Sequence, residues 1–191
     1  MMDKEDFEGG VSFQKLLDIH INQNDYQVDF DRLVNLQGVI FVNDVMNTEA
    51  IAGGQDTFKK TVTRVNYKEG WNDPASWDTL NGVPSNLCKA GQLCNLHLHS
   101  HTSSKNLYDH DTSLYSNPTA VGIIFGNGNI GSGSLEDGNY LKPLVSSDLF
   151  MSRDAGQNWQ KVAEGPWIVA VGDQGGLMVR VRALKPTNLI L

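Results

Sequence analysis

Three alternating histidines offer the first spacing that could support chemistry. His97, His99 and His101 are separated by single residues, so a strand would place all three on one face. Such a row can bind zinc, but no carboxylate or thiolate follows at a spacing that completes the site. Asp109-His110-Asp111 and Glu136-Asp137-Gly138 lack the spacing of a calcium loop. We therefore expect packed or hydrogen-bonded histidines, solvated acidic turns and no metal ion.

A glycine pattern similar to a phosphate-binding loop occurs at Gly126-Asn127-Gly128-Asn129-Ile130-Gly131. The G-x-G-x-x-G motif holds a dinucleotide only where a helix begins directly after it, because helix N–H groups bind the phosphates. Gly133, Gly138 and Pro143 interrupt the segment that follows. The context therefore predicts a loop and no cofactor.

Arginine placement bears on the main enzymatic alternative, a sialidase-like glycoside hydrolase. Such a site needs arginines that converge on the substrate carboxylate and a tyrosine nucleophile. The chain has Arg32, Arg64, Arg153, Arg180 and Arg182. The last two alternate on one predicted strand, and no converging triad is visible. We predict no catalytic residues and a protein that is not an enzyme, and the hydrolase stays the alternative.

The most specific motif is Ser152-Arg153-Asp154-Ala155-Gly156-Gln157-Asn158-Trp159, which matches the Asp-box, S-x-D-x-G-x-x-W, at every defined position. The spacing is typical of a hairpin turn. Asp154 is expected to accept backbone N–H bonds, Gly156 to adopt a positive φ, and Trp159 to bury its ring over the turn. Ser152 is expected to tie the incoming strand to the loop. The box is structural and recurs in propeller blades.

The residues around the box predict a blade. A second, degenerate box is expected by position at Asn66-Tyr67-Lys68-Glu69-Gly70, with Trp71 or Trp77 as its aromatic residue and Lys68 in place of the aspartate. After the first box come Gly165-Pro166-Trp167, the turn 172–176 and the alternating run 177–181. A strand, a box, two strands, a glycine turn and a strand are the content of one four-stranded blade.

Composition and charge exclude several partners. The chain has 22 Asp and Glu against 15 Lys and Arg, a net charge of −7, and no basic run longer than Lys59-Lys60. Nucleic acid and anionic membrane surfaces are therefore unsuitable partners. No run approaches the roughly 18 apolar residues of a membrane span, and the acidic start is followed by no apolar core of a signal peptide. We expect no nucleic-acid binding and no direct membrane contact.

Most of the secondary structure that positions these residues is predicted to be β-strand. With 40% hydrophobic residues and 19 glycines, the composition predicts a soluble, turn-rich all-β protein. A turn or two of helix is expected over residues 29–36, and long loops over 69–89 and 102–118. Strands are predicted at residues 11–17, 38–45, 58–67, 95–100, 120–125, 148–152, 159–163, 167–171 and 176–183.

An ordered series of segments resembles the Vps10 domain of sortilin-type receptors. Cys94-Asn95-Leu96-His97-Leu98-His99, with Cys88 before it, resembles the family's C-x-LHLH strand. The other segments of the series are Asp29-Phe30 through Leu36-Gln37-Gly38-Val39, the proline-led strand 117–122 followed by 126–131, and the turn Asp173-Gln174-Gly175-Gly176. They occur in the family's order over roughly residues 8–190.

The resemblance implies a fold and a disulfide. The family's domain is a ten-bladed β-propeller, and residues 1–191 would be part of that one domain, truncated at both ends, with about three to four blades of four antiparallel strands. Spacing alone fits two reduced thiols as well as a disulfide between Cys88 and Cys94; the resemblance implies the disulfide. A bridge over so short a loop would contribute about 2–3 kcal/mol.

The resemblance also implies a function. The chain would be the part of a sorting receptor that binds protein or peptide cargo, on the lumenal side of Golgi or endosomal membranes or at the cell surface, in a parent with one membrane span. A propeller scaffold without cargo is a further alternative. Ile19 stands where the family's basic anchor for peptide carboxylates is expected, so the ligand-binding residues are left unassigned. There is no N-x-[ST] glycosylation sequon.

Overall fold

The computed structural model describes residues 28–67, 70–72, 79–80, 83–84, 94–100, 102–103 and 114–183. Within them, short strands far outnumber helical segments. In chain order the elements are β1 (Phe30–Arg32), β2 (Ile40–Val45), α1 (Thr48–Ala52), β3 (Thr61–Tyr67), β4 (Gly70–Asn72), β5 (Thr79–Leu80), β6 (Val83–Pro84), β7 (Cys94–Leu98), β8 (Tyr115–Ser116), β9 (Ile124–Ser132), the 3-10 turn η1 (Leu144–Ser146), β10 (Asp148–Ser152), β11 (Gln160–Ala163), β12 (Trp167–Gly172), the 3-10 turn η2 (Asp173–Gly175) and β13 (Leu177–Arg182). The predicted all-β class is confirmed. The strand predicted at residues 11–17 lies outside the described residues.

Two sheets of the same design follow one another along the chain. In the first, β1, β2, β3 and β4 pair in sequence order, and in the second β7, β9, β10 and β11 do so, with the short β8 added beside β9. The strand pairs of both sheets are antiparallel. β12 and β13 form a hairpin of their own, as do β5 and β6. A four-stranded antiparallel meander is the unit of a propeller blade.

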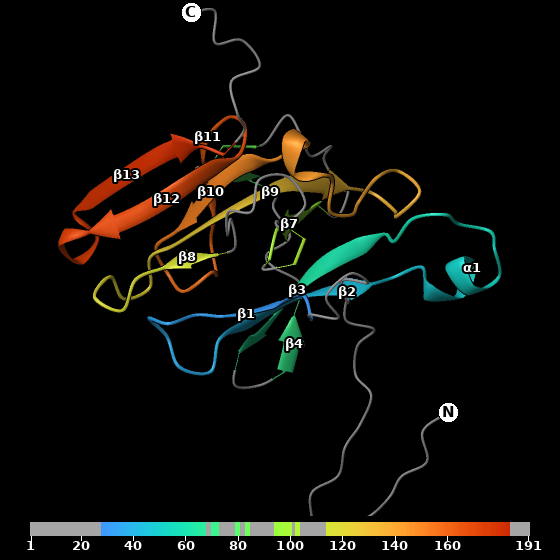
Figure 1. Cartoon of the computed structure of the whole chain (residues 1–191), viewed down its shortest axis with the longest axis horizontal. Helices are drawn as coiled ribbons and strands as arrows, with labels where there is room; N and C mark the ends of the chain where they lie inside the picture. Colours follow the sequence, from blue (N-terminus) through green and yellow to red (C-terminus); the bar gives the residue numbers. More distant parts are fainter. Residues whose placement is uncertain are drawn as a thin grey trace, which may run out of the picture.

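The sheets are stacked face to face through two apolar clusters. Successive residues of a strand point to opposite faces, so Phe150 of β10 packs toward the first sheet and Leu149 toward β12. Figure 1 shows the resulting series, with β1–β4 and the β12–β13 hairpin on opposite sides of the sheet that contains β9. The first cluster joins Leu33, Val39, Phe41 and Val65 to Leu96, Leu98, Ile124, Phe150 and Trp159. The second joins Phe125, Leu149, Ile123 and Met151 to Val169, Trp167 and Val171. The stacking is that of consecutive blades in part of a β-propeller.

The blade that contains the box differs from the predicted one. The hairpin of β10 and β11 pairs with β9 and β7, which precede it in the chain, whereas β12 and β13 form the next layer. The prediction that the box and the strands after it make one blade is therefore wrong. The local order of strand, turn and strand is the same in both arrangements, so only long-range pairing separates them.

Two local predictions are also wrong. Residues 30–32 form β1 and pair with β2, where a helical turn was expected. The glycine pattern 126–131 lies inside β9 and is not a loop. A Cβ at Gly128 would overlap the His97 carbonyl, and a Cβ at Gly131 would lie 2.6 Å from Oδ1 of Asn139. Close approach of neighbouring chain segments, not a turn, therefore requires these glycines.

The predicted long loops contain further strands. Residues 70–72 form β4, which pairs with β3 up to Tyr67 and Gly70, so only Lys68 and Glu69 separate the two strands. Residues 153–159 separate β10 from β11. The degenerate box is thus at the corresponding place, between the third and fourth strands of a sheet, and its residues Lys68 and Glu69 lie outside the described residues. β8 lies within the second predicted loop.

Candidate functional site: the Asp-box turn and the joints between sheets

The turn between β10 and β11 is closed by two side chains. Oγ of Ser152 donates to Oδ1 of Asp154 at 2.9 Å and accepts the backbone N–H of Gly156 at 2.8 Å. Oδ1 of Asp154 also accepts the backbone N–H of Asn158 at 2.8 Å, and the Asn158 amide donates to Oδ2 at 2.6 Å. Gly156 has a φ of 88°, a conformation that costs glycine little. The turn is thus held from within by the residue types of the motif.

Trp159 connects this turn to the first sheet. Its indole N–H donates to the Gly156 carbonyl at 2.9 Å, and the side chain is 1% exposed. Its ring meets Phe41 of β2 edge-on, with centroids 6.2 Å apart and planes at 85°. This geometry is the favoured one for aromatic pairs. The box therefore fixes a bulky side chain at the contact between two sheets.

Hydrogen bonding lowers the pKa of Asp154. Burial pushes the pKa of the carboxyl upward, but the hydrogen bonds from Asn158, Ser152 and its own backbone N–H together hold the pKa below its usual value. The group is accordingly a carboxylate at neutral pH, and both of its oxygens accept hydrogen bonds within the turn.

Replacing Asp154 by alanine is expected to lower the free energy of unfolding by about 1–2 kcal/mol, because the hydrogen bonds from Ser152 and Asn158 are lost together. Asp154→Asn keeps an acceptor oxygen and should cost less. Urea unfolding at pH 7 measures both values. Equal stability of the alanine variant and the wild type would show that the turn does not depend on this carboxylate.

A buried polar joint connects β2 and β3 of the first sheet to β7, the end strand of the second. It consists of Asp29, Asn43 and Thr63 with the backbone of Leu98. The Asn43 amide donates to Oδ2 of Asp29 at 2.7 Å, and Oγ1 of Thr63 donates to Oδ1 of Asn43 at 2.8 Å. Oγ1 of Thr63 accepts the N–H of Leu98 at 2.7 Å, and the backbone N–H of Thr102 donates to Asp29 at 2.9 Å. The carboxylate is 0% exposed, so each of these bonds is made away from water.

The two described histidines of the predicted row, His97 and His99, have different surroundings. Nε2 of His97 lies 2.8 Å from Oδ1 of Asn139, and His97 is fully buried. His99 is also buried, yet neither of its ring nitrogens has a hydrogen-bond partner. Burial lowers the pKa of His99 to about 4, while the charge of Asp29 and backbone groups of Ser103 and Lys142 act in the opposite direction. His99 is therefore a neutral imidazole at neutral pH. His101 lies outside the described residues.

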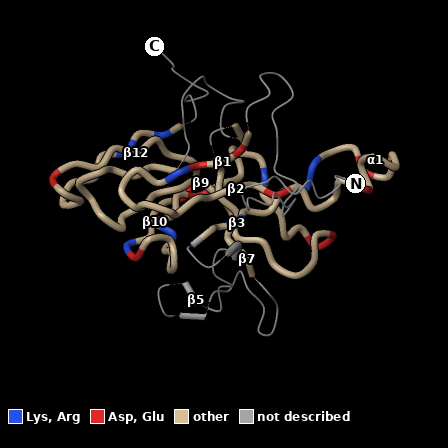
Figure 2. Tube along the Cα trace, turned by 90° about the horizontal axis from the view of Figure 1, so that it is seen from below, with Lys and Arg blue, Asp and Glu red and all other residues tan. Residues whose placement is uncertain are grey.

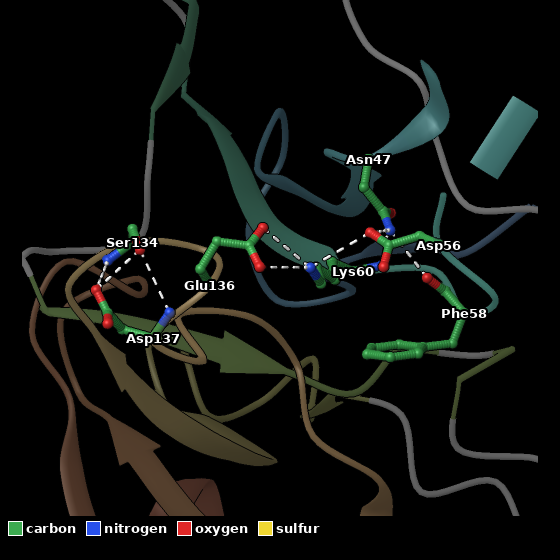
Figure 3. A network of polar contacts seen from close by, with 7 residues as sticks. All are labelled: Asn47, Asp56, Phe58, Lys60, Ser134, Glu136 and Asp137. Carbon is green, nitrogen blue, oxygen red and sulfur yellow. Dashed lines mark hydrogen bonds and ion pairs between the residues drawn. The ribbon is translucent and has the colours of Figure 1, made fainter. Parts of the chain in front are cut away.

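A second joint, the lysine joint, is made of charged groups on the connecting loops. Nζ of Lys60 lies 3.1 Å from Glu136 and 3.3 Å from Asp56, and the lysine side chain is 8% exposed. Figure 3 shows Lys60 between the two carboxylates, and the separate turn that Asp137 closes with Ser134. The hydrogen bond with Glu136 raises the pKa of Lys60, and that from Asn47 lowers the pKa of Asp56. Glu136 and Asp137 are thus occupied by structural contacts.

The five arginines are spread over four places in the fold: Arg32 on β1, Arg64 on β3, Arg153 in the box turn, and Arg180 and Arg182 together on β13. Arg64 pairs with Asp44 at 3.6 Å, and Arg180 and Arg182 stack on Trp167. Figure 2 shows basic and acidic residues interspersed along the described trace. Within the described part of the chain, no three His, Cys, Asp or Glu residues are grouped as metal ligands would be. None of the described helices has the length and apolarity that a membrane crossing requires.

The structure describes one of the two cysteines of the predicted disulfide. Cys94 begins β7, is 1% exposed and takes part in a disulfide. Its predicted partner Cys88 lies outside the described residues, so the pairing stays a prediction. Ile19 and Asp109-His110-Asp111 also lie outside them.

Sequence reasoning missed both joints. The signal for the buried polar joint is the pair Asn43-Asp44 inside the apolar run 38–45, because a polar residue on the buried face of a strand needs a partner. Lys60 gives no such signal, since its partners Asp56 and Glu136 come from loops that only the fold brings together. Thr63 is equally unremarkable in an alternating strand.

Comparison with known proteins gives one consistent result. The family model Sortilin-Vps10, described as Sortilin, neurotensin receptor 3, matches residues 8–191. Vacuolar protein sorting/targeting protein 10 of Kluyveromyces lactis is 32% identical over 192 residues, which cover 95% of this chain and 11% of the relative. Its namesake in Schizosaccharomyces pombe is 34% identical over 165 residues, 85% of this chain and 10% of the relative. Vacuolar protein sorting/targeting protein PEP1 of Saccharomyces cerevisiae is 32% identical over 186 residues, 95% of this chain and 11% of the relative. The chain spans about a tenth of the length of these relatives.

Proposed function

Because this chain belongs to the sortilin–Vps10 family, we propose that it is part of the cargo-binding propeller of a sorting receptor in the secretory pathway. The family match over residues 8–191 carries the proposal. Two successive sheets, one of four strands and one of four strands plus β8, pack face to face and support it, because a propeller offers its ligands a rigid surface built from adjacent blades. Residues 1–191 are then part of one propeller domain.

The proposed cargo is protein or peptide, sorted between the Golgi and an endosome, lysosome or vacuole. The names of the relatives, vacuolar protein sorting/targeting proteins, support this route. The disulfide at Cys94 supports a lumenal location, because disulfides persist in oxidising compartments. In this proposal Cys88 is the partner of Cys94, the parent has one membrane span, and the segment itself binds neither nucleic acid nor membrane.

The proposed role is binding without catalysis. Asp154 is held as a structural carboxylate and Glu136 is paired with Lys60, while Arg64 pairs with Asp44 and Arg180 and Arg182 stack on Trp167. These placements favour a receptor over the sialidase-like alternative. We propose no catalytic, metal or cofactor residues, and we assign Ser152, Asp154, Gly156 and Trp159 the role of holding one blade against the next.

A binding measurement with the purified receptor ectodomain that contains this chain tests the proposal. We expect at least one soluble vacuolar or lysosomal hydrolase precursor to bind the immobilised ectodomain with a Kd of about 1 μM or below, a range typical of specific interfaces. A cargo-free scaffold would retain none of a panel of such precursors. Turnover of a fluorogenic sialoside by the same ectodomain would instead favour the hydrolase.

A further inference from the structure

A buried asparagine joins the second sheet to the β12–β13 hairpin. Asn127 of β9 is 0% exposed, and β12 packs against the sheet that contains β9 (Figure 1). The backbone N–H of Trp167 donates to Oδ1 of Asn127 at 2.8 Å, and Nδ2 of Asn127 donates to the Trp167 carbonyl at 2.8 Å. An amide side chain carries the donor and the acceptor side by side that this backbone requires. We call this pair of hydrogen bonds the asparagine joint.

The first sheet has an equivalent asparagine. β2 and β9 are the second strands of their sheets, and Asn43 of β2 is likewise 0% exposed. Its Nδ2 donates to the Leu98 carbonyl of β7, the first strand of the next sheet, at 3.2 Å. The two asparagines differ in the residue that follows them, which is Asp44 in one case and Gly128 in the other. Asn43 is therefore a natural comparison for Asn127.

The residue after Asn127 is a glycine for a separate reason. A Cβ at Gly128 would overlap the His97 carbonyl, because β7 and β9 pair closely there. Two independent contacts, one to β12 and one to β7, thus require asparagine and glycine in succession. In this dipeptide the side-chain amide is lost most readily, because no side chain hinders the approach of the glycine nitrogen to the amide carbon. The fold therefore carries a chemically labile pair in its interior.

We propose that Asn127-Gly128 is a deamidation site, that the asparagine joint protects it while β12 is packed on β9, and that reaction there breaks the joint irreversibly. The backbone nitrogen of Gly128 attacks Cγ of Asn127 and loses its proton, while the bond from Cγ to Nδ2 breaks and ammonia leaves. Water then opens the cyclic imide at either carbonyl and gives aspartate or isoaspartate. Because Trp167 holds both ends of the amide, Cγ can turn toward the Gly128 nitrogen only when β12 separates locally from β9.

Neither product of the reaction can restore the asparagine joint. An aspartate at position 127 has no donor for the Trp167 carbonyl and places a negative charge at a site that is 0% exposed. An isoaspartate adds a methylene group to the main chain of β9 and so disturbs its register with β7 and β10. Reaction at this one residue therefore detaches β12 from the second sheet. This inference goes beyond the proposed function and does not depend on cargo binding.

Peptide mapping by mass spectrometry tests the site in the receptor ectodomain that contains this chain. Samples are incubated at neutral pH in the folded state and in guanidinium chloride, and the conversion of each asparagine is followed over time. In the denatured sample we expect Asn127 to react as fast as Asn81, which also precedes a glycine, and Asn43 to react much more slowly. In the folded sample Asn127 should react at least about tenfold more slowly than in the denatured one, a factor that corresponds to a local opening free energy of about 1.4 kcal/mol.

A substitution that mimics the product tests the consequence. Asn127→Asp should speed hydrogen exchange of the β12 amides at least about tenfold. Asn129→Asp is the matched control, because this amide lies on the same strand but contacts the Tyr140 carbonyl, and it should leave β12 unchanged. An Asn127→Asp ectodomain that fails to fold beside a folded Asn129→Asp control supports the same conclusion. Equal reaction of Asn127 in the folded and denatured samples overturns the proposal, as does an intact Asn127 in a denatured sample where Asn81 reacts, or unchanged β12 exchange in Asn127→Asp.

Discussion

Replacing Trp159 by alanine is expected to lower the free energy of unfolding by about 3–5 kcal/mol, the usual cost of removing a buried aromatic side chain. The ring is 1% exposed and contacts Phe41 across the two sheets, and its N–H holds the box turn through the Gly156 carbonyl. The substitution therefore opens a cavity at the sheet contact and loosens the turn at the same time. For a domain with a total stability of about 5–15 kcal/mol, such a loss is a large fraction.

Two comparisons make the Trp159 prediction specific. Trp159→Phe retains an aromatic ring and loses the hydrogen bond, so its loss should be markedly smaller. Trp167→Ala removes a partly exposed ring in the second cluster and is also expected to cost less. Urea unfolding of the three variants and the wild type gives the values. A loss below about 1 kcal/mol for Trp159→Ala would contradict the assigned contact between the sheets.

Acidification is expected to destabilise the protein through His99. The pKa of this imidazole falls from 6.5 in the unfolded chain to about 4 in the folded one because the ring is buried. Between these values the unfolded chain binds the extra proton, so the free energy of unfolding falls as pH falls. One pKa unit corresponds to about 1.4 kcal/mol, so His99 alone removes about 3 kcal/mol between pH 6.5 and pH 4 and nothing above that range.

A variant without the titrating group isolates this effect from other groups. His99→Gln cannot be protonated, so its stability should decrease less than that of the wild type as pH falls from 7 to 4, and the difference between the two curves should approach about 3 kcal/mol. Urea unfolding at half-unit pH intervals provides the curves. Parallel curves for the two proteins would mean that His99 is not buried as a neutral group in the folded state.

The sequence predicted most of the strands because their side chains alternate. The run 148–152 is β10 with the predicted bounds, and 167–171 and 176–183 correspond closely to β12 and β13. The box residues also lie in the predicted turn between two strands, since the residue types of the motif make its hydrogen bonds locally. These elements depend on neighbours in the chain, and such information is present in a single sequence.

What the sequence could not predict depends on distant contacts. β1 has three residues and exists because β2 pairs with it. The glycines of β9 suggest a turn, yet they lie within a strand. The absence of a side chain at Gly128 lets the His97 backbone lie against β9, and its absence at Gly131 does the same for the side chain of Asn139. The lysine joint requires residues 60 and 136 to meet, which no spacing indicates. α1 has five residues, too few to give a helical period.

Cargo sorting in cells tests the receptor proposal most directly. In Saccharomyces cerevisiae, the segment of the protein sorting/targeting relative that aligns with this chain is replaced by residues 8–191, and secretion of a soluble vacuolar hydrolase precursor is measured. We expect cells with the hybrid receptor to secrete no more of the precursor than cells with the unmodified relative, and cells with the Trp159→Ala hybrid to secrete more. Secretion at the level of cells without the receptor, from a hybrid that is expressed and reaches the Golgi, would contradict a cargo-binding role for this chain.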